Sequence, residues 1–444
     1  MEMILDKQCS RAVGDRKEIF MTAQVQSIDT TKPTQVNRKD IIIAVLLLIA
    51  GGVILVLGGF GTQPGEQAIF TDHILGDLFS LSSRGTLYTV GFMCILIAGL
   101  RLIRAFDSIQ VVLTWGAVFL LLFGFLIWIT SGTKLNITGM FQSMLTAATP
   151  LTLGALAGIL CERAGIINIA IEGMMLSGAF AAVAFAGVFD SLWMGLLCAS
   201  LVGGAMAAVH AVLSIKYKVD QIISGTVINI LAAGATRFLN LRLLEPFGLS
   251  TPGHMSIIRI PLLADIPLLG PILFENSPIV FIMLILVAVI NYAIFFTPWG
   301  LRMRACGEHP RAADTVGIHV NPMRYVSIIL GGLIAGIGGA YFSLGVVGAF
   351  EDNMTRGQGF VALAAMIFGN WNPVGGFMAA LLFGFADALQ VKMQILRPLL
   401  PFINAYIPHE FLQMAPYLLT IVVVAGVVGR SRPPAEEGKP YEKQ

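Results

Sequence analysis

Apolar residues along the chain occur in about twelve continuous runs, most of them close to the length of a membrane-crossing helix. About 20 residues of α-helix span the hydrocarbon core of a bilayer, whereas membrane β-strands alternate apolar and polar positions in short units. The pattern therefore predicts an all-α, polytopic membrane protein. The predicted spans are roughly 41–60, 84–100, 109–130, 138–160, 166–188, 191–214, 221–240, 278–297, 323–346, 358–370, 373–394 and 411–428.

Only a short turn, from Gly369 to Pro373, separates the tenth and eleventh runs. This pair forms either two full crossings or two half-length helices that enter and leave by the same side. Two loops between the spans are long. Loop 241–277 contains five prolines, and loop 298–322 is the most polar of the loops on its side of the membrane.

Composition supports the membrane class and excludes others. Only 12% of the 444 residues are charged, against about 25% in a typical soluble domain, which argues against a soluble enzyme. A net charge of +2 gives no indication of nucleic-acid binding. The five cysteines lack metal-ligand or disulfide spacing, and we expect no cofactor.

The distribution of Lys and Arg predicts the orientation, because cytoplasmic loops carry the excess of these residues. With twelve crossings and the N-terminus inside, 20 of the 28 basic residues fall on the cytoplasmic side. Residues 1–40 are polar and lack the apolar core of a signal peptide. We therefore expect both termini to be cytoplasmic, with 1–40 and 430–444 as polar tails.

Motifs for nucleotide chemistry are missing or have a simpler explanation. No G-x-x-x-x-G-K-[ST] phosphate-binding motif occurs, so the chain is not expected to be an enzyme that hydrolyses ATP by that route. Gly336, Gly338 and Gly339 imitate part of a dinucleotide-binding motif, but no strand precedes them. Gly332, Gly336 and Ala340 instead form a ladder of small residues that favours close helix packing.

Polar residues inside the spans are the candidates for a solute path, because burying them in a bilayer is costly. Glu172 and Asn168 lie four residues apart in the fifth predicted span, on one helical face. They either line a passage near its cytoplasmic mouth, or Glu172 caps a neighbouring broken helix.

The seventh predicted span carries a stripe of polar and small residues on one face. Its members are Gln221, Gly225, Asn229, Ala232, Thr236 and Asn240. Such a face either packs against another helix or lines a wet path. We predict Asn168, Glu172, Gln221, Gly225, Asn229 and Thr236 as path residues, and His210 as a hydrogen-bonded packing residue.

Loop 298–322 has the punctuation of one short helix that follows the end of a longer one. Pro298 and Gly300 end one helix, and Pro310 can occupy the first turn of another. A short helix with a basic exposed face is suited to docking into a groove of a partner protein. The alternative is an ordinary positively charged cytoplasmic loop.

From about residue 137 to 429 the chain resembles the permease subunits of bacterial ABC importers of the simple-sugar, branched-chain amino acid and nucleoside superfamily. Within it, the shorter permease of nucleoside-type systems is most similar. The resemblance rests on TPL at 149–151, CERAGIINIAIEGMM at 161–175, DQIISGTVIN at 220–229, loop 298–318 and GQGFVALAAMIFG at 357–369.

This resemblance implies a permease of the cobalamin-importer type, in which ten helices carry a cytoplasmic coupling helix after the sixth. Residues 131–429 would form that core, and residues 41–130 would add N-terminal helices, the third of which can belong to the core. Ala312, Ala313 and Gly317 match the coupling motif Ala-Ala-x-x-x-Gly, whereas Arg311 stands where many importers have Glu. The candidate coupling residues are Arg302, Arg304, Glu308, Arg311, Ala312, Ala313 and Gly317.

The resemblance also implies the partners and the activity. A cytoplasmic ABC ATPase would dock on the coupling loop, a second permease would pair with this chain in the plasma membrane of a bacterium, and an extracytoplasmic lipoprotein would deliver solute near loop 241–277. Nucleosides are the expected substrate, with a simple sugar or riboflavin as alternatives. An ion-coupled secondary transporter is the rival mechanism, with Glu172 and Asp387 as its only candidate ion-binding carboxylates.

Overall fold

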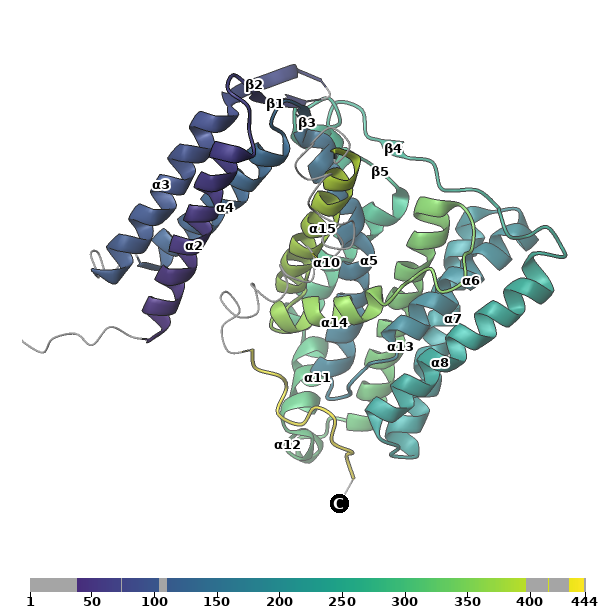
Figure 1. Ribbon diagram of the computed structural model, residues 1–444. Helices are drawn as coiled ribbons and strands as arrows, with labels where there is room; N and C mark the ends of the chain where they lie inside the picture. The colour runs from purple at the N-terminus through teal and green to yellow at the C-terminus, as the bar shows by residue number, and fades with distance from the viewer. Residues whose placement is uncertain (1–37, 73, 104–109, 397–413, 415–430, 443–444) are drawn as a thin grey trace, which may run out of the picture. The chain divides into compact units, whose positions relative to one another are not determined.

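The computed structural model describes residues 38–442 except 73, 104–109, 397–413 and 415–430. Residues 1–37 of the predicted N-terminal tail and, except for residue 414, the predicted span at 411–428 therefore lie outside the described residues. The chain divides into two compact units, one of 1–64 with 84–128 and one of 65–83 with 129–444. Figure 1 shows the ribbon with the helices and strands of each unit labelled.

The first unit contains three long apolar helices, α2 (Arg38–Phe60), α3 (Ser83–Leu102) and α4 (Gln110–Ile129). Arg84 donates from its guanidinium to the carbonyl oxygens of Gly58 and Gly59 at the end of α2. A cation there offsets the partial negative charge of the helix C-terminus. Arg101 forms an ion pair with Asp40 at 3.1 Å.

The second unit starts with a three-stranded sheet in the order β2-β1-β3. Strand β1 (Gln67–Asp72) pairs antiparallel with β2 (Gly76–Ser82) and parallel with the short β3 (Lys134–Asn136). Strand β3 leads directly into α5, whose first turn is capped by the Asn136 side chain accepting from the amide of Gly139 at 2.9 Å.

A bundle of helices forms the rest of the second unit. In chain order it comprises α5 (Ile137–Arg163), α6 (Ile171–Phe189), α7 (Leu192–Ala211), the π-helical turn η2 (Val212–Lys216), α8 (Gln221–Leu239), η3 (Asn240–Leu244), β4 (Ile258–Arg259), α9 (Leu269–Phe274), β5 (Glu275–Asn276), α10 (Pro278–Phe296), α11 (Pro298–Glu308), α12 (Pro310–Thr315), α13 (Val320–Ala340), η4 (Tyr341–Val347), α14 (Gln358–Phe368) and α15 (Pro373–Leu396).

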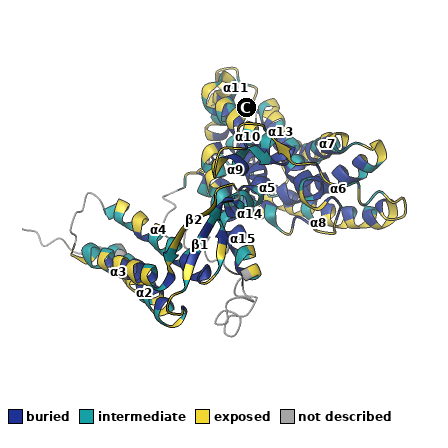
Figure 2. Ribbon diagram, turned by 90° about the horizontal axis from the view of Figure 1, so that it is seen from above, coloured by how far each residue is buried: buried dark blue, intermediate teal, exposed yellow. Residues whose placement is uncertain are grey.

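Helix α5 is the centre of this bundle and packs against α13, α14 and α15. It begins at the end of the unit that carries the sheet and finishes at the end that carries α11 and α12. We call these the sheet end and the α12 end. Figure 2 shows α5 and α6 as mostly buried, whereas α2 and α3 of the first unit present many exposed residues.

The predicted small-residue ladder in α13 is confirmed at Gly332 and Gly336, which face α7 and α6. A methyl group at Gly178 of α6 would lie 2.6 Å from the carbonyl oxygen of Gly336. The backbones therefore approach too closely for any side chain at these positions, as is typical of membrane helix pairs.

Among the described residues, ten helices are long and apolar enough to cross a membrane. They confirm an all-helical, polytopic protein, with two small sheets that the apolar pattern did not predict. Two predicted spans differ from the structure. The fifth begins at Ile171 rather than near 166, and the tenth is only the 11-residue helix α14.

Helix α14 measures about 16 Å at 1.5 Å per residue and is too short to cross a core of about 30 Å. The non-helical η4–α14 connector (348–357) precedes it, while α15 is full length at 24 residues. Both α13 and α15 run from the α12 end toward the sheet end, so the chain must return between them. The tenth crossing therefore consists of a non-helical half, made of bends and turns, and a helical half, rather than being one of two half-length helices.

Candidate functional site

The α5–α6 connector (164–170) enters the bundle without forming a helix, and three side chains satisfy its backbone. The carboxamide oxygen of Gln221 accepts from the amide of Ile167 at 2.7 Å. His210 Nε2 lies 3.0 Å from the carbonyl oxygen of Ile167, and Asn229 Nδ2 donates to that of Ile169 at 2.9 Å. These bonds replace those of a helix, since buried backbone groups need partners.

His210 also lies 3.1 Å from the Ser224 hydroxyl through Nδ1. The prediction that His210 is a hydrogen-bonded packing residue is confirmed. Asn168 is fully buried in the same connector, where its Nδ2 donates to Cys161 Sγ at 3.2 Å. Because residue 168 precedes the first turn of α6, it does not share a helical face with Glu172, contrary to the prediction.

Helix α8 aims its polar stripe at this connector. The Asp220 carboxylate accepts from the amides of Ile222 and Ile223, which fixes the start of the helix at Gln221. The stripe residues are buried or half-buried, whereas most of their neighbours along α8 are exposed. Thr236 lies further along and donates within its own helix to Ala232, so it is not part of the cluster around the connector.

Glu172, in the first turn of α6, caps the N-terminus of α14. Helix α14 follows the η4–α14 connector, just as α6 follows the α5–α6 connector. Its carboxylate accepts from Thr355 Oγ1 at 2.5 Å, from the amide of Gly357 at 2.8 Å and from that of Gly359 at 2.7 Å. An anion at a helix N-terminus satisfies the free amides and offsets their partial positive charge. This geometry agrees with the alternative in which Glu172 caps a neighbouring broken helix.

Two glycines make this cap possible. Gly357 adopts a φ of +82°, which favours glycine, and a methyl group at Gly359 would lie 2.7 Å from the Glu172 Cα. Asn229 of α8 contacts the first turn of α6, next to Glu172, because its Oδ1 accepts from the amide of Gly173 at 2.7 Å. The N-termini of α6 and α14 therefore meet inside the bundle, joined by Glu172.

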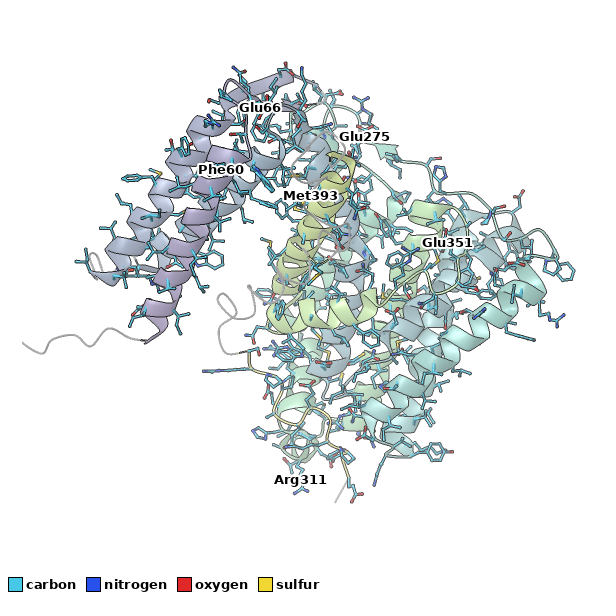
Figure 3. All side chains as sticks on the ribbon, in the orientation of Figure 1. Phe60, Glu66, Glu275, Arg311, Glu351 and Met393 are labelled. Carbon is cyan, nitrogen blue, oxygen red and sulfur yellow. The ribbon has the colours of Figure 1, made fainter. Side chains whose placement is uncertain are left out.

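The coupling loop forms two helices, of which only the second was predicted. Pro310 begins α12 as expected. Helix α10 ends at Phe296, just before Pro298, but Pro298 then begins the additional helix α11, because a proline needs no amide partner in a first turn. Gly317 has a φ of +85° just past α12, where its amide donates to the Asp314 carbonyl oxygen at 2.9 Å and the helix ends. Figure 3 places Arg311 at the α12 end of the second unit and Glu275 at the opposite end.

The predicted coupling residues have different surroundings. Arg302, Arg311, Ala312 and Gly317 are exposed, whereas Ala313 is buried against Cys306 and Val320. The guanidinium carbon of Arg304 lies 5.2 Å from the centre of the Phe295 ring, a cation–π contact. Glu308 accepts through Oε2 from the amide of Ala435. Helix α12 therefore exposes one face and packs its other face against small apolar side chains of α11 and α13.

Several residues that join distant parts of the α12 end were not predicted from the sequence. Arg324 is 1% exposed and donates to the carbonyl oxygens of Ala164 and Lys439. The Trp371 indole donates to Glu162 at 2.6 Å. The paired glycines Gly357 and Gly359 ahead of an apolar run were the one available signal for the α14 cap.

Comparisons with known proteins agree with this arrangement. A family model described as the permease component of branched-chain amino acid transport systems matches residues 140–425. That match contains the connectors and both coupling helices, but not the N-terminal helices or the segment after 425.

Among curated proteins, the chain is 42% identical over 308 residues to the guanosine ABC transporter permease protein NupQ of Bacillus subtilis, covering 67% of this chain and 95% of that one. It is 38% identical to the nucleoside ABC transporter permease protein NupC of Lactococcus lactis, covering 68% and 96%. A putative glucose ABC transporter permease of Haloferax volcanii is 34% identical, covering 66% and 92%. No solved structure matches the chain.

Proposed function

The chain belongs to the family of permease components of branched-chain amino acid transport systems, and from this membership we propose that it is the membrane subunit of an ATP-driven importer of nucleosides. The guanosine and nucleoside permeases, at 42% and 38% identity, support this substrate over a sugar, since the glucose permease is at 34%.

The single observation that carries an ATP-driven mechanism is the α11–α12 pair. It presents Arg302 of α11 and Arg311 and Ala312 of α12 to solvent, and Ala313 of α12 packs against Val320 at the start of α13. We assign ATP hydrolysis to cytoplasmic partner subunits that dock there. Their closure on ATP would move α12 and shift the permease between inward- and outward-open states, which requires different contacts in the two states.

The α12 end is then the cytoplasmic side, and the sheet end faces outward. A recess of about 320 Å³ at the sheet end lies between Asp190 and Ser191 of the α6–α7 turn and Leu249 and Thr251 of loop 241–277. This recess is where we place the docking of a solute-binding lipoprotein. A second, related permease would pair with this chain, because both Bacillus subtilis and Lactococcus lactis have a further matching permease of the same description.

The six predicted path residues remain part of the proposal. Asn168, Glu172, Gln221, Gly225 and Asn229 gather where the two non-helical connectors meet, which is the position that binding sites occupy in transporters with broken helices. Their bonds to backbone groups also give them a positioning role. Thr236 lies further toward the sheet end of α8.

Charge reversal on the α11–α12 pair tests this function. We expect Arg311→Glu combined with Arg302→Glu to weaken ATPase docking by about 2 kcal/mol, roughly thirtyfold, and to abolish uptake of labelled guanosine in cells that contain the whole importer. Arg259→Glu, an exposed reversal at the sheet end, is the matched control and should leave ATPase docking unchanged. Uptake that survives ATP depletion but collapses with the ion gradient would instead establish a secondary transporter.

A further inference from the structure

The C-terminal segment 431–442 crosses the α12 end of the second unit and is bonded to it along its length. We call it the tail strap. Figure 1 shows it as the yellow segment passing α11 and α12. The amide of Glu436 donates to the Gly307 carbonyl oxygen at 3.0 Å, and the amide of Gly438 donates to that of Gly165 at 3.2 Å. The family match ends at residue 425, so this segment lies beyond it.

Buried contacts hold the strap in one place. Arg324 bonds Ala164 at 3.1 Å and Lys439 at 3.3 Å, which ties the strap to the α5–α6 connector. Tyr441 packs against the cluster around Ala313 beneath α12. At its far end Glu442 pairs with Lys218, just before α8. The strap is therefore part of the same surface as α12.

Helix α12 is too small to be a docking site by itself. Six residues of helix extend about 9 Å, whereas a stable protein interface covers about 800 Å² per partner. A subunit that docks on α12 must therefore also contact the surface around α12, part of which is formed by the tail strap.

The strap and α12 together enclose a recess of about 640 Å³. Arg311 and Ala312 form one wall, and Lys439, Pro440 and Tyr441 form the other. Glu436 is already paired with Lys439, and Glu442 with Lys218, whereas within the described part of the chain Arg311 makes no ion pair. The recess therefore presents a guanidinium to an incoming carboxylate, with which it can form two parallel hydrogen bonds.

We propose that the tail strap completes the ATPase docking surface, so that an acidic side chain of the ATPase enters the recess between the strap and α12. This inference rests on the proposed function. It assigns to the strap a direct contact with the partner, in addition to its contacts within the chain.

Photo-crosslinking in the assembled importer tests the contact. The photoreactive residue p-benzoylphenylalanine replaces Pro440 in one variant and Glu442 in a second, which guards against misfolding of either. The same residue at Ala312 on α12 reports docking itself, and at Leu262, an 84% exposed residue of the sheet end, it is the negative control. We expect a band at the summed mass of permease and ATPase from positions 440 or 442 and from 312, and none from 262.

The outcomes separate the two proposals. A crosslink from position 312 without one from 440 or 442 overturns the strap inference and leaves the proposed function standing. The absence of a crosslink from 312 as well as from the strap counts against the proposed function. A crosslink from 262 to the ATPase reverses the assignment of the two ends.

Discussion

Glu172 shows how a single carboxylate can hold two interrupted crossings together. It stands in the first turn of α6, yet its three hydrogen-bond donors come from 355–359, about 180 residues later in the chain. Glu172 is only 8% exposed, so little water is available to replace its carboxylate as the hydrogen-bond acceptor. Buried amides left without an acceptor are costly, which makes this residue important for stability whatever its part in the solute path.

Glu172→Gln should lower the midpoint of thermal unfolding in detergent. The amide retains one acceptor oxygen and turns a donor toward the amides of α14, and each buried donor left unsatisfied costs about 1–3 kcal/mol. Asp190→Asn is a matched control, because Asp190 is an exposed residue at the other end of α6 with a φ of 48°, a conformation that Asn tolerates. Equal midpoints for the two variants would contradict the capping role.

At the scale of elements, the coupling helices and the tail strap form one layer at the α12 end. Pro310 and Gly317 set the start and end of α12, and Ala313 anchors it. The strap covers the next surface, where the side chain of Glu437 hydrogen-bonds that of Glu162. Burial raises the pKa of Glu437 above its usual range, although the bond from Glu162 partly opposes the shift.

This raised pKa predicts a pH-dependent strap. A carboxyl group whose pKa is higher in the docked state stabilises docking below its ordinary pKa of about 4.3, and that contribution is lost as pH rises through the docked value. Hydrogen exchange of the strap amides should therefore increase with pH in the native chain, relative to Glu437→Gln measured at the same pH. The ratio of the exchange rates of the native chain and the variant at each pH cancels the intrinsic pH dependence of exchange. A ratio that does not change with pH would contradict a role of Glu437 ionisation in strap docking.

At the scale of the whole molecule, the second unit places its charged coupling layer and its small sheets at opposite ends of the helix bundle. Every crossing from α5 to α15 connects these ends, including the one in which bends and turns take the place of half a helix. In the orientation that we propose, the α12 end is cytoplasmic, since Lys and Arg are in excess in cytoplasmic loops. Arg259 and Arg311 should therefore lie on different sides of the membrane.

Cysteine labelling checks this topology. In a background with Cys9→Ser and Cys198→Ser, which leaves only cysteines that are buried, Arg259→Cys should react with an impermeant maleimide in intact cells. Arg311→Cys should react only after permeabilisation. Cys306 is buried and its pKa is raised to about 11, so it should stay unlabelled in both conditions. The reverse pattern would invert the proposed orientation.

The sequence by itself determined the class of the protein, most span positions, the start of α12 and the small-residue packing of α13. These features depend on hydrophobicity and on backbone preferences of Pro and Gly, which act locally along the chain. Only the tertiary structure decided where helices give way to non-helical connectors. Non-helical backbone survives inside a membrane protein only if distant side chains satisfy it, here Gln221, His210 and Asn229 for one connector. For the same reason the acceptors of the tail strap, such as Gly165 and Gly307, could not be read from its own residues.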